Sequence, residues 1–173
     1  TFVVGHVGRY CEAKNYNTIL KIVKSLFSKL ENCCFLFCGR GIKDFFDKNI
    51  NDQTLRSRII TPGHCHDISN YYNIMDCFLF PSLNEGQSNA LIEAMLYSLP
   101  IISSDIDSIK ETVHESMQPY LFKPINDSEF VNAILDIFDN GCNYNVFSVR
   151  EWAEDKYSQQ KRFLDFYKIL NER

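Results

Sequence analysis

The sequence contains no long apolar run and no excess of positive charge. No stretch approaches the ~20 consecutive apolar residues that cross a bilayer, so the sequence predicts no membrane-spanning helix. The formal net charge is −4, which argues against a general nucleic-acid-binding surface. There is also no internal repeat, no low-complexity segment and no signal-peptide pattern. These absences leave a globular, non-nucleic-acid-binding protein as the expectation.

The cysteines lack the spacing of a metal site or a redox pair. Seven cysteines are present, but none form a C-x-x-C pair. Cys38 and Cys77 fall within apolar runs, where a free thiol behaves as a small hydrophobic side chain. We therefore expect reduced cysteines and a cytoplasmic protein. The segment His64-Cys65-His66 has no partner pair at zinc spacing, so we interpret it as an exposed loop and expect neither metal nor cofactor.

The 173 residues are enough for one well-packed domain but not for two. The hydrophobic fraction of 45% and the aromatic fraction of 14% are typical of a globular protein. The chain starts at Thr1, without a methionine, directly in a strand-like run. We expect residues 1–173 to be one domain of a longer protein.

Short apolar runs alternate with stretches that have helical periodicity. The expected strands are Phe2–Val7, Cys33–Cys38, Ile59–Ile60, Cys77–Phe80, Pro100–Ser103 and Tyr120–Phe122. The expected helices are Ile19–Leu30, Ile42–Lys48, Ile68–Asn73, Ser88–Tyr97, Ser108–His114, Phe130–Phe138 and about 149–170. This alternation predicts an α/β fold with a doubly wound, mostly parallel, Rossmann-like sheet. Ligands of such sheets bind outside the carboxyl ends of the strands.

The segment Pro81–Met95 carries the most specific pattern at such a strand end. Glu85 lies in the loop that follows an apolar strand, and Glu93 lies eight positions later on the next helix. A helix N-terminus offers free N–H groups to a phosphate, and ionised carboxylates accept hydrogen bonds from hydroxyls. Phosphate together with hydroxyls describes a nucleotide sugar. The alternative is an ordinary strand–loop–helix unit with two solvated glutamates.

Two cations follow the first expected strand. Arg9 and Lys14 together would neutralise a diphosphate, and cations already in place stabilise the charge that develops on a departing diphosphate. The alternative is that both are solvated loop cations. Gly39 and Gly41 form a lone G-x-G at the next strand end, which is a weak signal for phosphate approach.

Several motifs, in order, resemble those of the retaining glycosyltransferases of family 4, which have the GT-B fold. The motifs are Val7-Gly8-Arg9 with Lys14-Asn15, Phe37–Gly41, Asp67–Asp76, the Glu85/Glu93 pair of an E-x7-E motif, and Leu99–Ile102 with Glu111. The resemblance covers nearly the whole chain, but only the C-terminal, donor-binding half of such an enzyme.

The resemblance implies roles for individual residues. It places Arg9 and Lys14 on the departing diphosphate, Glu85 on hydroxyls of the transferred sugar and Glu93 on the ribose; Arg9, Lys14 and Glu85 are the candidate catalytic residues. The candidate donor-binding residues are Gly8, Gly39, Gly41, Gly86, Gln87, Ser88, Asn89 and Glu93, of which Ser88 or Asn89 could equally be a helix N-cap. Asp105 and Asp107 form a D-x-D pattern, which binds a divalent metal in another glycosyltransferase class. We interpret it here as coincidence, because the resemblance is to a metal-independent family.

The implied reaction is transfer of a hexose, with retention, from a UDP-, GDP- or ADP-sugar during polysaccharide or glycoconjugate biosynthesis. The acceptor glycan or lipid would bind a missing N-terminal domain, which the final helix (about 149–170) would contact, and peripheral membrane association stays open. A nucleotide-sugar epimerase half-domain and a non-catalytic nucleotide-binding module are the alternatives.

Three departures from the family pattern affect the expected sugar. Ser98 stands where the family usually has glycine, Asp107-Ser108 replace a common Gly-Gly pair, and Lys110 replaces a common proline. We expect these changes to alter sugar identity more than nucleotide binding.

Overall fold

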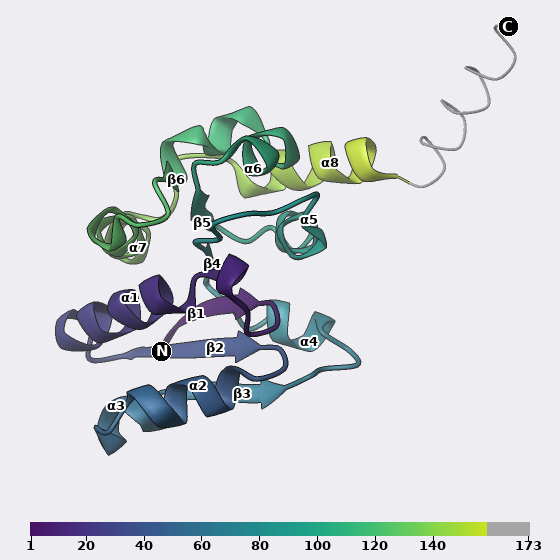
Figure 1. Cartoon of the computed structure of the whole chain (residues 1–173). Helices are drawn as coiled ribbons and strands as arrows, with labels where there is room; N and C mark the ends of the chain where they lie inside the picture. The colour runs from purple at the N-terminus through teal and green to yellow at the C-terminus, as the bar shows by residue number, and fades with distance from the viewer. Residues whose placement is uncertain (159–173) are drawn as a thin grey trace, which may run out of the picture.

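Six parallel strands form a sheet in the order β3-β2-β1-β4-β5-β6 (Figure 1). The computed structural model describes residues 1–158. The strands are β1 Phe2–Val7, β2 Cys33–Cys38, β3 Ile59–Gly63, β4 Cys77–Phe80, β5 Ile101–Ser104 and β6 Leu121–Phe122. Every strand pair is parallel, which confirms the predicted doubly wound α/β fold. The strand order reverses between β1 and β4, the position at which such sheets open a crevice for ligands.

Helices cover both faces of the sheet (Figure 1). They are α1 Tyr16–Lys29, α2 Ile42–Asn49, α3 Gln53–Ser57, α4 Ser69–Tyr72, α5 Asn89–Leu96, α6 Asp107–Thr112, α7 Asp127–Asn140 and α8 Val146–Tyr157, with 3-10 turns η1 Glu12–Lys14 and η2 Glu115–Tyr120. Helices α1 and α7 pack against each other, as do α5 and α8.

The strand β2 shows how one apolar run serves two cores. Phe35 and Phe37 belong to the hydrophobic cluster that includes α1 and α7, whereas Leu36 and Cys38 belong to the cluster that includes α5 and α8. Side chains alternate between the two faces of a strand, and both faces are covered here. This explains why a continuously apolar run, rather than an alternating one, forms a central strand.

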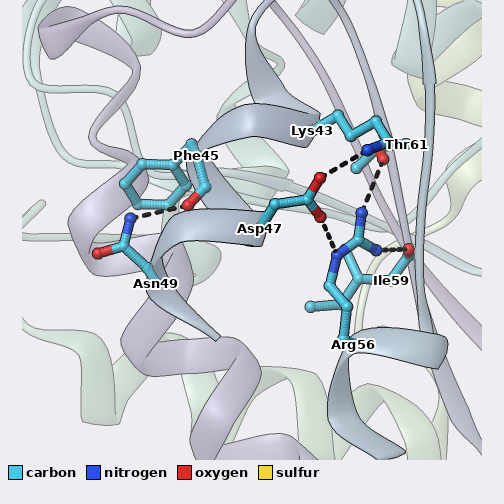
Figure 2. Close-up of polar contacts among 7 residues, drawn as sticks. All are labelled: Lys43, Phe45, Asp47, Asn49, Arg56, Ile59 and Thr61. Atoms are coloured by element: carbon cyan, nitrogen blue, oxygen red, sulfur yellow. Dashed lines mark hydrogen bonds and ion pairs between the residues drawn. The ribbon is translucent and has the colours of Figure 1, made fainter. Parts of the chain in front are cut away.

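The sequence reading missed the short helix α3, which tertiary contacts hold in place. The side chain of Asp52 caps it by accepting hydrogen bonds from Thr54 N at 2.8 Å and Leu55 N at 3.1 Å. Arg56 then joins three elements, because its Nε lies 2.7 Å from Asp47 Oδ1 on α2 and its Nη1 donates to Ile59 O on β3 at 2.7 Å (Figure 2). Helices α2 and α3 are thereby attached to the edge strand β3.

The last described helix begins earlier than expected. The expected range was about 149–170, but α8 starts at Val146 because Asn145 caps it, accepting hydrogen bonds from Phe147 N and Ser148 N. It ends at Tyr157, and the rest of the expected range, with Phe163, Phe166 and Tyr167, lies outside the described residues. Across residues 1–158, no helix is both long enough and apolar enough to cross a bilayer.

Ser98 adopts a backbone conformation that suits glycine. Its φ is +55°, in the left-handed region, where a side chain costs roughly 1–2 kcal/mol. Its hydroxyl oxygen is buried and has no hydrogen-bond partner in the described chain. This geometry accounts for the glycine that the family usually places here, and it makes Ser98 a strained position in this protein.

Candidate functional site

A cavity of about 360 Å³ opens at the carboxyl ends of β1 and β2. Its walls come from the β1 and β2 ends, from the loop after β3 and from α5. The lining residues are Val7, Gly8, Arg9, Cys38, Gly39, Arg40, His64, Cys65, Ile68 and Glu93. The structure thus brings together four of the sequence-predicted site residues: Gly8, Arg9, Gly39 and Glu93.

The cavity combines two guanidinium groups with one carboxylate over a partly apolar floor. Arg9 and Arg40 are exposed, so their charges are available to a ligand, while Glu93 is half-buried. Burial raises the pKa of the Cys38 thiol to about 12, so this floor residue is uncharged at neutral pH. Cations suit a phosphate and a carboxylate suits hydroxyls. The cavity therefore offers both kinds of contact that a nucleotide requires.

The two glycines at this rim allow β1 and β2 to approach each other closely. A Cβ on Gly39 would lie only 2.2 Å from Gly8 O, so no other residue fits there without a backbone shift. The Tyr16 hydroxyl donates to the same Gly8 carbonyl at 2.8 Å. These contacts hold the loop that carries Arg9 against the end of β2.

Glu93 is positioned by a buried tyrosine. The Tyr72 hydroxyl lies 2.9 Å from Glu93 Oε2 and 3.2 Å from Ala90 O. Burial, reinforced by the Glu93 carboxylate, raises the pKa of Tyr72 far above its ordinary value, so the phenol keeps its proton and donates. One carboxylate oxygen of Glu93 is thus occupied by the protein, and the other is available to a ligand.

Lys14 and Glu85 form an ion pair beside the cavity. Lys14 Nζ lies 2.7 Å from Glu85 Oε1, and the two side chains are only 15% and 12% exposed. The same ammonium lies 4.3 Å from the centroid of the Phe80 ring. A Cβ on Gly8 would lie 3.1 Å from Lys14 Cε, which places the lysine next to the cavity wall. The pair joins the loop after β1 to the loop after β4.

His6 lies in the core beneath this rim. It is fully buried among aromatic rings, and its Nδ1 lies 2.9 Å from Leu79 O, while its Nε2 has no hydrogen-bond partner in the described chain. Burial lowers its pKa from 6.5 to about 3, so the imidazole is neutral. Since Nδ1 donates to the carbonyl, Nε2 is left as an unprotonated acceptor.

The remaining predicted residues lie outside the cavity. Gly86 and Gln87 are exposed on the loop between β4 and α5, and Asn89 is exposed at the first position of α5. Ser88 is buried and is the N-cap residue of α5, although its side chain makes no capping hydrogen bond. Gly41 lies at the start of α2 and lines a separate hollow next to Tyr10. Their proposed contacts with phosphate therefore depend on backbone groups near the cavity and stay predictions.

Asp105 is engaged within the protein, because its carboxylate pairs with the Lys110 ammonium. Throughout residues 1–158, no three His, Cys, Asp or Glu side chains are grouped so as to hold a metal ion. The His64 and His66 rings lie against each other, with centroids 5.3 Å apart.

Sequence reasoning missed Arg40 and Tyr72 as site residues. Arg40 lies between the two glycines of the G-x-G, so its place at a strand end was a usable signal. Tyr72 carries no comparable signal, because its contact with Glu93 depends on how α4 packs beside α5.

The comparisons with known proteins concern the chain as a whole and identify its family. Residues 1–140 match the family model described as Glycosyl transferases group 1. Among curated proteins, the poly(ribitol-phosphate) alpha-N-acetylglucosaminyltransferase of Staphylococcus aureus (strain COL) is 23% identical over 173 residues, which covers 98% of this chain and 35% of that protein.

Two solved structures share the fold. A TarM variant of S. aureus, crystallised with UDP and other ligands, gives a TM-score of 0.85 at 22% identity and covers 98% of this chain and 35% of that one. HepE of Anabaena in complex with UDP-glucose gives a TM-score of 0.82 at 20% identity, covering 100% of this chain and 49% of that one. The chain spans about a third to a half of the length of these proteins. Since the family model matches residues 1–140, the chain belongs to the glycosyl transferases group 1 family.

Proposed function

We propose that this chain is the donor-binding domain of a retaining, family 4-like glycosyltransferase that uses a UDP-sugar. The observation that carries the proposal is the cavity at the carboxyl ends of β1 and β2, because Arg9, Arg40 and Glu93 all line it. UDP is the nucleotide to test first, because both structural relatives described above were crystallised with UDP or UDP-glucose.

The proposal assigns each charged group a role. Glu93, held by Tyr72, accepts hydrogen bonds from the ribose hydroxyls, and Glu85 accepts them from the transferred hexose. Arg9 and Lys14 contact the diphosphate, which gains negative charge as the glycosidic bond breaks. Cations positioned in advance stabilise that developing charge more than they stabilise the bound donor. The backbone of the segment Gly86–Asn89 supplies further N–H donors to the phosphates.

The proposed setting is the biosynthesis of a cell-surface polysaccharide or glycoconjugate. One relative transfers N-acetylglucosamine to poly(ribitol-phosphate), as its name states. The acceptor, a glycan or lipid, would bind a part of the protein outside this chain, and such an acceptor is compatible with peripheral membrane association. We also propose a cytoplasmic location, with which seven free thiols are compatible, since a reducing compartment preserves them.

Calorimetry with UDP on the full-length protein, in the presence of a chelator, tests donor binding. We expect Glu93→Gln and Tyr72→Phe to weaken UDP binding, since a hydrogen bond to a charged group contributes about 1.5–3 kcal/mol. Glu129→Gln is the matched control, because Glu129 is exposed on α7 and lies outside the cavity. Binding that appears only after a divalent ion is added would refute the metal-independent site.

Product analysis tests the reaction itself. With a UDP-sugar and acceptor, we expect the new glycosidic bond to keep the anomeric configuration of the donor, as NMR of the product would show. An epimerised nucleotide sugar formed without acceptor would favour the epimerase alternative, and no nucleotide binding at all would favour a scaffold.

A further inference from the structure

Asn15 uses both N–H groups of its side-chain amide to hold two loops at the rim. It lies directly after Lys14, is only 8% exposed and has a left-handed φ of +56°. Its Nδ2 donates to Pro81 O at 3.0 Å and to Pro124 O at 2.9 Å. An amide nitrogen has two hydrogens, so both are engaged.

The two carbonyls belong to loops that follow strands which are not neighbours. Pro81 follows β4 and Pro124 lies in the loop after β6, and β5 lies between these strands in the sheet. The Asn15 amide therefore joins the loop after β1, on which it lies, to the loops after β4 and β6, although β5 separates those two strands. A second bond, from Leu83 N to Ala13 O at 2.8 Å, attaches the same loop after β4 to the turn η1.

These bonds connect the same two loops as the ion pair between Lys14 and Glu85. Asn15 is bonded to Pro81, and Pro81 begins the loop on which Glu85 lies four residues later. A donor that takes Lys14 onto its phosphate and Glu85 onto its sugar removes the direct bond between the two side chains. The hydrogen bonds of the Asn15 amide and the backbone bond of Leu83 then still connect the two segments.

We propose that Asn15 is a positioning residue for sugar transfer, which fixes the Lys14 ammonium relative to the Glu85 carboxylate while the donor separates them. The inference rests on the proposed function. Its physical reason is that catalytic groups must hold their geometry closely, since a misplacement of ~1 Å can lower a rate by about 100-fold. Asparagine suits the position twice, because it tolerates the left-handed backbone and supplies both donors.

Substitutions at Asn15 test the proposal in the full-length protein. Asn15→Gly keeps a residue that favours the left-handed backbone and removes the amide, whereas Asn15→Asp keeps the shape and replaces the donors by an acceptor facing two carbonyls. We expect kcat for UDP release from the UDP-sugar to fall by roughly 10- to 100-fold in both, with UDP affinity within about threefold of the unsubstituted protein. If Asn15→Gly does not fold, the kcat and UDP affinity of Asn15→Asp test the proposal.

Asn49→Ala is the matched control, because it also removes a bond from an amide to a carbonyl, between Asn49 Nδ2 and Phe45 O at 2.7 Å on α2 (Figure 2). We expect it to leave kcat unchanged. Equal loss of kcat in the control, or a normal kcat in folded Asn15→Gly, would overturn the positioning role.

A double substitution separates positioning from a general structural role. If Asn15 acts through Lys14, then Asn15→Gly should lower kcat by less than about threefold when Lys14 is already alanine, because coupled residues are not additive. If the double variant instead loses kcat by the product of the two single losses, the inference is overturned and the proposed function stays intact. If the unsubstituted protein binds no nucleoside diphosphate, the proposed function is refuted and this inference with it.

Discussion

Replacing Glu85 by glutamine should have opposite effects on nucleotide binding and on sugar transfer. In the structure the Lys14 ammonium is engaged by Glu85 at 2.7 Å, and both side chains are largely shielded from water. A diphosphate that binds Lys14 must therefore compete with Glu85 for the same cation. Removing the carboxylate charge makes that competition weaker.

The size of the effect follows from what the substitution leaves in place. The glutamine amide oxygen can still accept a hydrogen bond from the charged Lys14, so only the attraction between the two opposite charges is lost. That loss releases the lysine by about 1 kcal/mol, the upper part of the range for ion pairs near a protein surface. We expect UDP to bind about fivefold more tightly, since 1.4 kcal/mol corresponds to a factor of ten. Turnover of the UDP-sugar should fall by about 10²-fold, because the carboxylate proposed to orient the hexose is lost.

Calorimetry with UDP in chelator and steady-state turnover in the full-length protein would measure both effects. Asp47→Asn is the matched control: it removes the same charge from the network of Lys43, Asp47 and Arg56, which Figure 2 shows beside Ile59. The network connects α2 and α3 to the edge strand β3, and none of its three residues lines the cavity. Weaker UDP binding in Glu85→Gln, or an equal gain in Asp47→Asn, would refute the competition argument.

Three further outcomes follow from the same geometry. Arg9→Ala and Lys14→Ala should each lower turnover at saturating donor by about 10²–10³-fold; normal turnover would make that residue a surface cation. Ser98→Gly should raise the free energy of unfolding by about 1 kcal/mol by relieving the left-handed φ of +55°, and an unchanged urea midpoint would show that no strain is stored there. His6 must be neutral in the folded protein at pH values above about 3, because burial lowers its pKa from 6.5 to about 3. Its contribution to stability is complete above pH 6.5 and falls as the pH drops toward 3, with about 2 kcal/mol lost at pH 5; urea unfolding of His6→Phe should lack this part of the pH dependence.

The strands could be predicted because burial on both faces leaves a plain signal. Cys33–Cys38 and Cys77–Phe80 were expected as strands and form β2 and β4 with the same bounds. Helix α3 escaped because it is only five residues long and buries only Leu55. Its stability depends on Arg56, which contacts α2 and β3, and no local pattern records such contacts.

The position of the site was predictable but its pairings were not. Parallel strands bring their carboxyl ends to one rim, so the loops that carry Arg9 and Glu85 were expected to meet there. That Lys14 would pair with Glu85, 71 residues away, depends on the strand order and the loop paths together. The same holds for Tyr72, which contacts Glu93 from a different helix. For Gly41 the sequence pattern was misleading: of the two glycines in the G-x-G, Gly39 lines the cavity, whereas Gly41 lines a separate hollow.

The two glutamates differ in how far the site is formed before a ligand arrives. Glu93 lies on α5 and is already oriented by the Tyr72 hydroxyl, so the proposed ribose would meet a carboxylate that needs no rearrangement. Glu85 lies on a loop and is paired with Lys14, so the proposed sugar and diphosphate would first have to separate the pair. Under the proposed function, the nucleoside supplies affinity at a preformed subsite, and part of that binding free energy offsets the opening of the ion pair. Opening would release the Lys14 ammonium for the diphosphate, on which negative charge develops as the bond breaks. A free nucleotide lacks the sugar that would occupy Glu85, so it leaves the carboxylate without a partner, and this is why the two substitutions Glu93→Gln and Glu85→Gln should move UDP affinity in opposite directions.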